Sequence, residues 1–189
     1  MRAARAVFLK RGFHGASLEE ISAQAGYSTG AVYSNFDSKD DLFLAVIDER
    51  SAERVRDLGE HVLDEKLGFE DALRMAARRS WQAARETPRW IPVLTEFWIH
   101  VADRDGIRDA TSKRHHGAMH ELAELIQALA DRHGMEYSLS ARDAARATSA
   151  LVRGMELERL LDPGADEAEL FEEIWTLFML GIARPKEDS

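Results

Sequence analysis

The 189-residue chain contains no cysteine, only four prolines, and no hydrophobic run long enough to cross a bilayer. The missing cysteines exclude disulfides and thiolate metal sites, which fits a reducing compartment. The longest apolar stretch, residues 174–183, is shorter than the roughly 20 residues that a membrane span needs, and we expect no signal peptide before the first helix. We therefore expect a cytoplasmic protein with no membrane partner.

Strand-like alternation, internal repeats and low-complexity tracts are also missing from the sequence. With 45% hydrophobic residues, the chain can bury one good core or two small ones. The hydrophobic spacing predicts an all-α fold. After a long helix from residue 39 to about 62, we expect helices at 69–86, 89–102, 107–133, 140–161 and 167–182. Thr87 and Pro88 would open helix 89–102. Asp105 and Gly106 precede helix 107–133, and Gly134 ends it. Helix 140–161 is ended by Asp162, Pro163 and Gly164.

The charge balance is acidic, with a formal net charge of −9. Such a balance argues against nonspecific coating of nucleic acid and against a lipid surface. Residues 1–36 differ, because they hold four cations (Arg2, Arg5, Lys10, Arg11) and two acids (Glu19, Glu20), a local net of +2. This local charge is sufficient for a few phosphate contacts per subunit.

Residues 17–47 carry the layout of a helix-turn-helix. Ser17 with Glu20 forms a capping box that starts one short helix, and Gly26 ends it in the left-handed conformation. Ser28 caps a second short helix, residues 29–35, whose Val32 faces Ile21 while its other side stays small and polar. Ser38 then caps the long helix. Lys39 lies in the first turn of that helix, where a cation opposes the helix dipole, and a nearby phosphate would resolve this conflict.

The run from Val7 to Val46 resembles the DNA-binding domain of the TetR family of transcriptional regulators. The resemblance is carried by GF at 12–13, AS at 16–17, EIS at 20–22, AGYS at 25–28, GAVYSNF at 30–36 and SKDDL at 38–42. It covers about a quarter of the chain. It implies a three-helix DNA-binding domain at 1–47 and a larger helical domain at 48–189 that binds an effector and dimerises.

The resemblance also implies which residues meet operator DNA. Residues 28–35 would form the recognition helix, with Thr29, Gly30 and Ala31 nearest the base edges. The full implied set is Ser17, Ser28, Thr29, Gly30, Ala31, Tyr33, Ser34, Asn35 and Lys39. Two positions depart from the family pattern: Ser22 replaces the usual alanine, a change we expect to be tolerated, and Asn35 replaces a frequent histidine. The first helix, expected at 2–11, has no basic arm ahead of it, so either the true start lies upstream or the protein does without such minor-groove contacts.

Aromatic residues of the central helices are candidates for an effector pocket. At helical spacing such residues form plain core more often than a ligand site, but the resemblance favours a pocket. The apolar stretch RWIPVLTEFWI at 89–99 suggests a mostly apolar ligand oriented by few polar groups. The candidate lining residues are Trp81, Trp90, Phe97, Trp98, His100 and Met119.

The last two predicted helices are candidates for a dimer interface. Apolar residues cover more than one face of residues 170–182, which exceeds what a surface helix needs, and small residues of the preceding helix permit close approach. Two helices from each subunit would form a symmetric four-helix interface. The candidate residues are Ala147, Leu151, Met155, Ile174, Leu177 and Phe178. A buried hairpin in a monomer is the alternative.

A metal site is the alternative from another class of function. His116, His120 and Glu124 share one helical face, and Glu96 and His100 share another, so a small helical metalloenzyme could use them. Exposed histidines and glutamates on a solvated helix are far commoner. The sequence shows no nucleophile beside a base, no phosphate-binding glycine loop and no paired carboxylates. We predict a homodimeric repressor without a cofactor, not an enzyme, released from operator DNA by a small effector.

Overall fold

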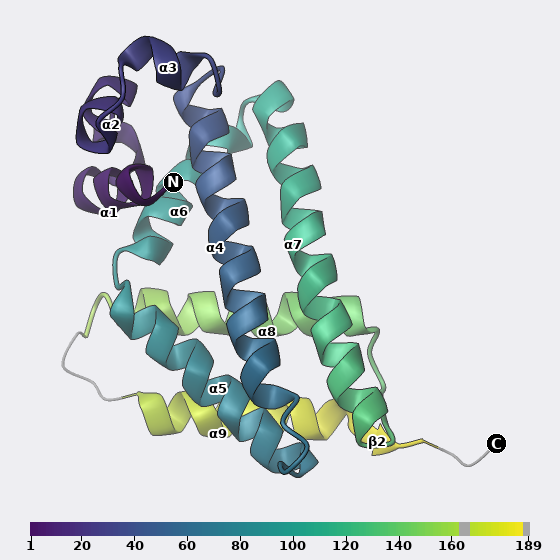
Figure 1. Ribbon diagram of the computed structural model, residues 1–189. Coiled ribbons are helices and arrows are strands. Elements are labelled where there is room, and N and C mark those ends of the chain that lie inside the picture. Colours follow the sequence, from purple (N-terminus) through teal and green to yellow (C-terminus); the bar gives the residue numbers. More distant parts are fainter. Residues whose placement is uncertain (163–166, 187–189) are drawn as a thin grey trace. The chain divides into compact units, whose positions relative to one another are not determined.

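The computed structural model describes residues 1–162 and 167–186, and these are built almost entirely of helices (Figure 1). They fall into two compact units, which we call unit 1 (residues 1–52 and 89–116) and unit 2 (residues 53–88 and 117–189). The helices α4 (Lys39–Val62) and α7 (Asp105–Arg132) contribute residues to both units. This division is not the expected one between residues 47 and 48, because unit 1 also takes in 89–116. The functional boundary at residue 47 stays a prediction.

Unit 1 contains α1 (Arg2–Gly15), α2 (Leu18–Ala25), α3 (Thr29–Tyr33) and α6 (Trp90–Ala102). Its core is centred on four buried rings, those of Phe8, Phe13, Phe43 and Phe97. The ring centroids of Phe8 and Phe43 are 4.7 Å apart, and those of Phe13 and Phe97 are 5.0 Å apart. Both pairs meet near edge to face, the arrangement that aromatic rings favour.

Helix α1 is longer than the expected 2–11 and is interrupted. Gly12 lies inside it at φ 75° and ψ 172°, outside the helical region, so two helical pieces meet at a kink. A positive φ is far easier for glycine than for other residues, which explains why Gly12 can stand at this point. The expected end at residue 11 therefore coincides with the start of the kink.

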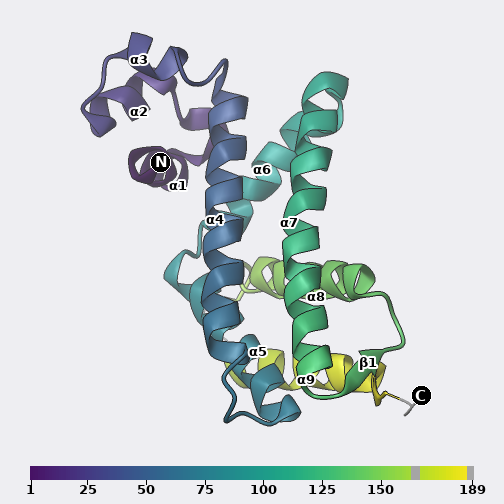
Figure 2. The same cartoon turned by 45° about the vertical axis from the view of Figure 1, so that its right-hand side comes forward.

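Unit 2 contains α5 (Phe69–Glu86), α8 (Ala141–Glu158) and α9 (Ala168–Ile182). Helix α5 buries a stripe that includes Leu73, Ala77 and Trp81, and Trp81 stacks on Phe171 of α9 with ring centroids 5.0 Å apart. Helices α8 and α9 lie side by side (Figures 1 and 2). The small buried residues of α8, among them Ala144, allow this packing.

The almost wholly helical fold that the sequence predicts also includes one short strand pair. Strand β1 (Met135–Tyr137) follows α7, and β2 (Ala183–Pro185) follows α9, and the two pair antiparallel with Glu136 opposite Arg184. Each strand has only three residues, which is too short for alternation to be visible in the sequence. Gly134, at φ 63°, ends the preceding turn as expected.

Several helix boundaries shift by a few residues. Thr87 does not open α6: its hydroxyl donates to the carbonyl of Ala83 at 3.1 Å and so closes α5. Helix α7 begins at Asp105, so the break lies just before the expected one, and α8 ends at Glu158 rather than at residue 161. Of the expected stop signal at residues 162–164, Pro163 and Gly164 lie outside the described residues. No helix that the structure describes has both the length and the apolar composition required to cross a membrane.

Candidate nucleic-acid interface

The two short helices α2 and α3 are set by caps and one turn, as the sequence predicts. The Ser17 hydroxyl accepts the backbone N–H of Glu20 at 3.1 Å, and the Ser28 hydroxyl accepts that of Ala31 at 3.2 Å. Gly26 between the helices adopts φ 73°, in the left-handed region. These contacts satisfy backbone donors at each helix start and so fix where each helix begins. Figures 1 and 2 show α2 and α3 adjacent at one end of unit 1.

A hydroxyl pair joins the two helices. Ser22 is buried, its hydroxyl donates to the carbonyl of Glu19 at 2.9 Å, and it lies 3.1 Å from the hydroxyl of Thr29. Thr29 is therefore half-buried and held at the start of α3 rather than fully exposed. The serine that departs from the family pattern is thus more than a tolerated replacement, because it fixes the side chain expected to meet base edges.

The outer side of α3 is small and polar, as expected. Gly30 and Ala31 are exposed, as are Ser34 and Asn35, which follow the end of α3 at Tyr33 because the helix is shorter than the expected 29–35. The Ser34 hydroxyl donates to the carbonyl of Ala31 at 2.8 Å, and the amide of Asn35 donates to the same carbonyl at 2.9 Å and to the Ser34 hydroxyl at 3.2 Å. Both amide N–H groups of Asn35 are then used within the helix end. A phosphate contact from Asn35 would require one of these bonds to break.

Two exposed tyrosines flank this side. Tyr33, which the resemblance indicated, is 50% exposed, and Tyr27 is 68% exposed. Sequence reasoning did not single out Tyr27. Its place in the turn, between Gly26 and the cap Ser28, is the signal that could have identified it, because a large ring there has no helix face to pack against.

Lys39 has a structural partner that the sequence did not reveal. Its ammonium donates to the carbonyls of His14 at 3.2 Å and Ala16 at 3.1 Å, and it lies 4.7 Å from the centre of the Phe13 ring. The argument that a cation here makes poor sense for stability alone is therefore wrong. An ammonium carries three N–H donors, so these bonds are compatible with a phosphate contact, which stays a prediction.

Four of the expected effector residues lie in unit 1. Phe97 is fully buried among Phe13 and Phe43, and Trp90 is buried beside Phe43 with the Arg50 guanidinium 4.7 Å from its ring. Trp98 packs on the edge of the same core. Packing in the core is sufficient to explain why these positions are aromatic, and no ligand is needed for that. The role of these residues toward an effector stays a prediction.

The polar member of that set, His100, has an acidic neighbour. Its Nε2 lies 3.1 Å from a carboxylate oxygen of Asp40. Burial lowers the pKa of His100 below its ordinary value, although the Asp40 charge acts in the opposite direction. The ring also contacts Phe13, with centroids 4.8 Å apart. His100 therefore links α6 to Asp40 at the start of α4 and to Phe13 of α1.

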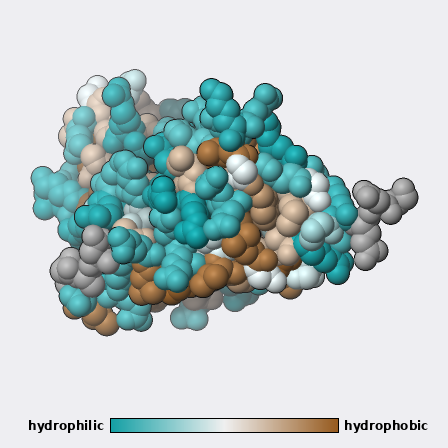
Figure 3. Space-filling view, turned by 90° about the horizontal axis from the view of Figure 1, so that it is seen from below, coloured by the Kyte–Doolittle hydropathy of each residue, from teal (hydrophilic) through white to brown (hydrophobic). Residues whose placement is uncertain are grey.

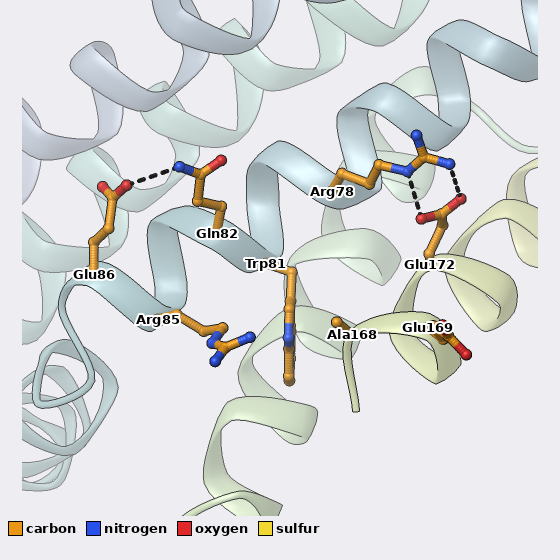
Figure 4. A pocket seen from close by; sticks show the side chains of 8 residues that line it. All are labelled: Arg78, Trp81, Gln82, Arg85, Glu86, Ala168, Glu169 and Glu172. Atoms are coloured by element: carbon orange, nitrogen blue, oxygen red, sulfur yellow. Dashed lines mark hydrogen bonds and ion pairs between the residues drawn. The ribbon is translucent and has the colours of Figure 1, made fainter. Parts of the chain in front are cut away.

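The remaining expected effector residues, Trp81 and Met119, are buried in unit 2. Trp81 lines a cleft of about 450 Å³ between the end of α5 and the start of α9 (Figure 4). On one wall Arg78 donates to both oxygens of Glu172, at 2.6 and 2.8 Å. This ion pair lowers the pKa of Glu172. Because Arg78 and Glu172 neutralise each other, their charges are less available to a ligand in the cleft. The cleft is lined by Arg78, Trp81, Gln82, Arg85, Glu86, Ala168, Glu169 and Glu172.

The histidines and glutamates with metal-ligand spacing do not converge. Glu96 accepts the backbone N–H of Phe13 at 2.8 Å, whereas His100 faces Asp40. His120 lies 3.5 Å from Glu124, and both are exposed. Across residues 1–162 and 167–186, no three histidine, aspartate or glutamate side chains form a group that could hold a metal ion.

The expected interface residues differ in exposure. Leu177 is 61% exposed and Ile174 is also exposed, whereas Phe178, Leu151 and Met155 are half-buried and pack on the core of unit 2. Leu170, at 49% exposure, continues the outward stripe. Figure 3, seen from below, shows hydrophobic residues gathered in a band. An apolar stripe of this kind along one helix is typical of an interaction surface.

Comparison with known proteins assigns both parts of the chain. Residues 1–46 match the model of bacterial regulatory proteins of the tetR family, and residues 69–178, more than half of the chain, match the BetI-type transcriptional repressor C-terminal model. The regulator PksA of Bacillus subtilis is 27% identical over 161 residues, which cover 83% of this chain and 75% of PksA. The repressor AcnR of Corynebacterium diphtheriae is 32% identical over 103 residues, about half of each chain (52% and 53%).

A solved structure supports the fold. The transcriptional regulator FadR of Bacillus subtilis, in complex with stearoyl-CoA, superposes with a TM-score of 0.72 over 96% of each chain at 18% identity. That identity shows a shared fold alone. With both family models describing regulators, and with the capped helix pair in place, the chain belongs to the TetR family of bacterial transcriptional regulators.

Proposed function

We propose that the chain acts in the cytoplasm as a homodimeric repressor that binds double-stranded operator DNA through α3 and the residues around it. The observation that carries the proposal is the exposed, small and polar side of α3, held by the Ser28 cap and the Ser22–Thr29 bond. Small residues let the backbone approach base edges, where sequence is read in the major groove. Tyr33, the last residue of α3, and Lys39, at the start of α4, suit phosphate contacts.

The apolar stripe of α9 supports the proposal of a dimer. Leu170, Ile174 and Leu177 recur at helical spacing and are exposed. Burying this stripe against a second copy would remove apolar area from water, the main favourable term in association. Two copies bring two reading helices, which doubles the phosphate contacts and fits the modest positive charge of residues 1–36.

An effector would act by linkage. A ligand that favours a conformation with lower operator affinity must itself bind less tightly to the DNA-bound protein, by the same factor. FadR, which shares the fold, is described in complex with stearoyl-CoA. We infer a mostly apolar effector for this chain from the apolar stretch at 89–99. Among the expected lining residues Trp81 is the one that faces the described cleft, where most of the other lining side chains are charged or polar.

The DNA-binding part is tested by selection. Full-length protein is used to enrich bound fragments from a random DNA library, and the enriched sequence is measured by titration at several salt concentrations. We expect a two-fold symmetric site with two half-sites, because a symmetric dimer presents its reading helices symmetrically. Enrichment of no sequence, or of an unsymmetric site bound by one copy, would contradict the proposal.

The effector part is tested with the four tryptophans. Stearoyl-CoA and shorter apolar acids serve as probes, and we follow tryptophan fluorescence, melting temperature and release of the selected operator. If the expected residues bind the probe, the quenching is lost in Trp98→Phe or Trp81→Phe and kept in Trp175→Phe, since Trp175 lies in the core of unit 2 and outside the expected set. Equal quenching in every variant would remove these residues from the site.

A further inference from the structure

The break in α1 frees a backbone donor in the core of unit 1. Because Gly12 leaves the helical conformation, the N–H of Phe13 is not directed along a regular helix, and its acceptor is a side chain 83 positions away, the carboxylate of Glu96 on α6. The distance from the Phe13 nitrogen to Glu96 Oε2 is 2.8 Å. A bond from an N–H to a carboxylate is stronger than one between neutral groups.

Gly12 and Glu96 fit each other closely. A Cβ atom at position 12 would lie 2.8 Å from one carboxylate oxygen of Glu96 and 3.0 Å from the other. The positive φ of 75° favours glycine here, and any larger residue would also push the Glu96 carboxylate out of its present position. The kink and the glutamate form a matched pair.

The segment that Glu96 holds leads directly to the DNA-reading helices. Residues 13–16 join the kink to Ser17, the cap of α2. Glu96 binds this segment at the N–H of Phe13, and Lys39 binds it at the carbonyls of His14 and Ala16. The segment is thus held from α6 at its beginning and from α4 at its end.

We propose that Glu96 is a positioning residue for operator binding: through the Phe13 N–H it sets the path of residues 13–16 and so the placement of α2 and α3. The bond also connects the two matched regions of the chain within unit 1, since Phe13 lies in residues 1–46 and Glu96 in residues 69–178. A movement of α6 would reach the reading helices through this contact.

The test compares three changes at one position by titration of the selected operator. Glu96→Ala removes the acceptor, Glu96→Asp keeps the charge but is one methylene too short, and Glu96→Gln keeps an oxygen at the same reach. We expect affinity to fall roughly tenfold for the first two and to stay within about threefold for Glu96→Gln, because an unsatisfied buried N–H is costly. The salt dependence should stay unchanged, since no phosphate contact is removed.

The matched control is Val93→Ala, which removes buried apolar volume from the same helix and core but leaves the Glu96 carboxylate and its bond to the Phe13 N–H in place. It should lower the melting temperature and keep operator affinity. Equal affinity losses in Val93→Ala and Glu96→Ala would mean that stability alone is responsible, and wild-type affinity in Glu96→Asp would likewise overturn the proposal. Should Glu96→Ala fail to fold, the comparison of Glu96→Asp with Glu96→Gln still decides it.

A second measurement uses the partner glycine. Gly12→Ala places a Cβ against the carboxylate, so it should weaken operator binding, and adding Glu96→Ala should relieve the steric part of that loss. The double variant is then expected to bind more tightly than the product of the two single effects predicts. Strictly multiplicative effects would show that the two residues act separately.

Discussion

The ammonium group of Lys39 binds within the protein, and we propose that it also contacts a DNA phosphate. We expect Lys39→Ala to lower the free energy of unfolding by about 1–3 kcal/mol, because two bonds to carbonyls and the contact with the Phe13 ring are lost. Affinity for all DNA sequences should fall similarly, and the salt slope should drop by about one per subunit. Denaturant titration and salt-dependent binding measure the two effects.

Lys10→Ala is the control for this lysine. Lys10 is exposed on α1, so its replacement changes the net charge equally and should leave the unfolding free energy within about 0.5 kcal/mol. If Lys39→Ala is as stable as Lys10→Ala, the carbonyl contacts contribute nothing. An unchanged salt slope would instead remove Lys39 from the phosphate contacts.

Ser22 and Thr29 provide a test of sequence discrimination. Ser22→Ala and Thr29→Val each break the hydroxyl pair while keeping the shape of the side chain. We expect each to cost about 0.5–1.5 kcal/mol of stability and to alter which sequence is enriched from random DNA, because the Thr29 side chain is no longer oriented at the start of α3. Unchanged sequence preference in both variants would mean that Thr29 does not read bases.

These residues also show where sequence reasoning ends. The caps Ser17, Ser28 and Ser38 could be predicted because each bonds to a backbone group three residues away. The partners of Lys39 and Thr29 could not, since they lie 23 to 25 and 7 positions away, across a turn whose geometry the sequence does not specify. For the same reason the sequence indicates Glu96 only as a possible metal ligand, because its partner Phe13 lies 83 positions away.

The ion pair between Arg78 of α5 and Glu172 of α9 predicts that the stability of the folded protein depends on pH. Arg78 lowers the pKa of Glu172 by hydrogen bonding and by its charge. A carboxyl group with a depressed pKa stabilises the folded state above its unfolded pKa and loses that contribution as the pH falls through the folded value. We therefore expect the melting temperature of wild type to exceed that of Glu172→Gln by a constant amount above about pH 6, and the difference to shrink below about pH 4.

Glu169→Gln is the control for this pH series. Glu169 lies in the first turn of α9, three residues before Glu172, but is exposed. Its melting temperature should follow that of wild type throughout the series. A difference between wild type and Glu172→Gln that does not change between pH 3 and 7 would show that the ion pair adds no stability.

Helix positions were more predictable than helix ends. The stripe of α5 and the apolar excess of α9 depend on residues three or four apart, and both helices lie within a residue of the expected ranges. Thr87 was misassigned because its hydroxyl can cap the helix that follows or bond back to Ala83, and the local sequence permits both. The strands were missed because their pairing joins residues almost fifty positions apart.

For the molecule as a whole, the decisive prediction concerns assembly. Leu177→Glu places a carboxylate in the outward stripe of α9, where Leu177 is 61% exposed in the single chain. If this stripe is buried between two copies, the dissociation constant of the dimer should rise at least about hundredfold, because an unpaired buried charge is costly. Sedimentation measures it, and operator affinity should fall with the loss of the second reading helix.

Leu139→Glu is the matched control, since Leu139 is also an exposed leucine of unit 2 but lies outside α8 and α9. It should remain dimeric. Phe178→Glu is the weaker test, because Phe178 is half-buried on the core of unit 2 and its replacement also disturbs folding. A folded, dimeric Leu177→Glu protein would place the interface elsewhere.

The short strand pair has a consequence for how unit 2 unfolds. By joining residues 135–137 to residues 183–185, and with Lys186 bonded to Asp131, it closes the segment that contains α8 and α9 into a loop. Because the strand pair holds both ends of this segment together, detaching α8 or α9 alone would release little chain entropy. Their backbone amides should therefore exchange hydrogen with solvent at one common rate, and removing residues 183–189 should make the two helices exchange at different rates.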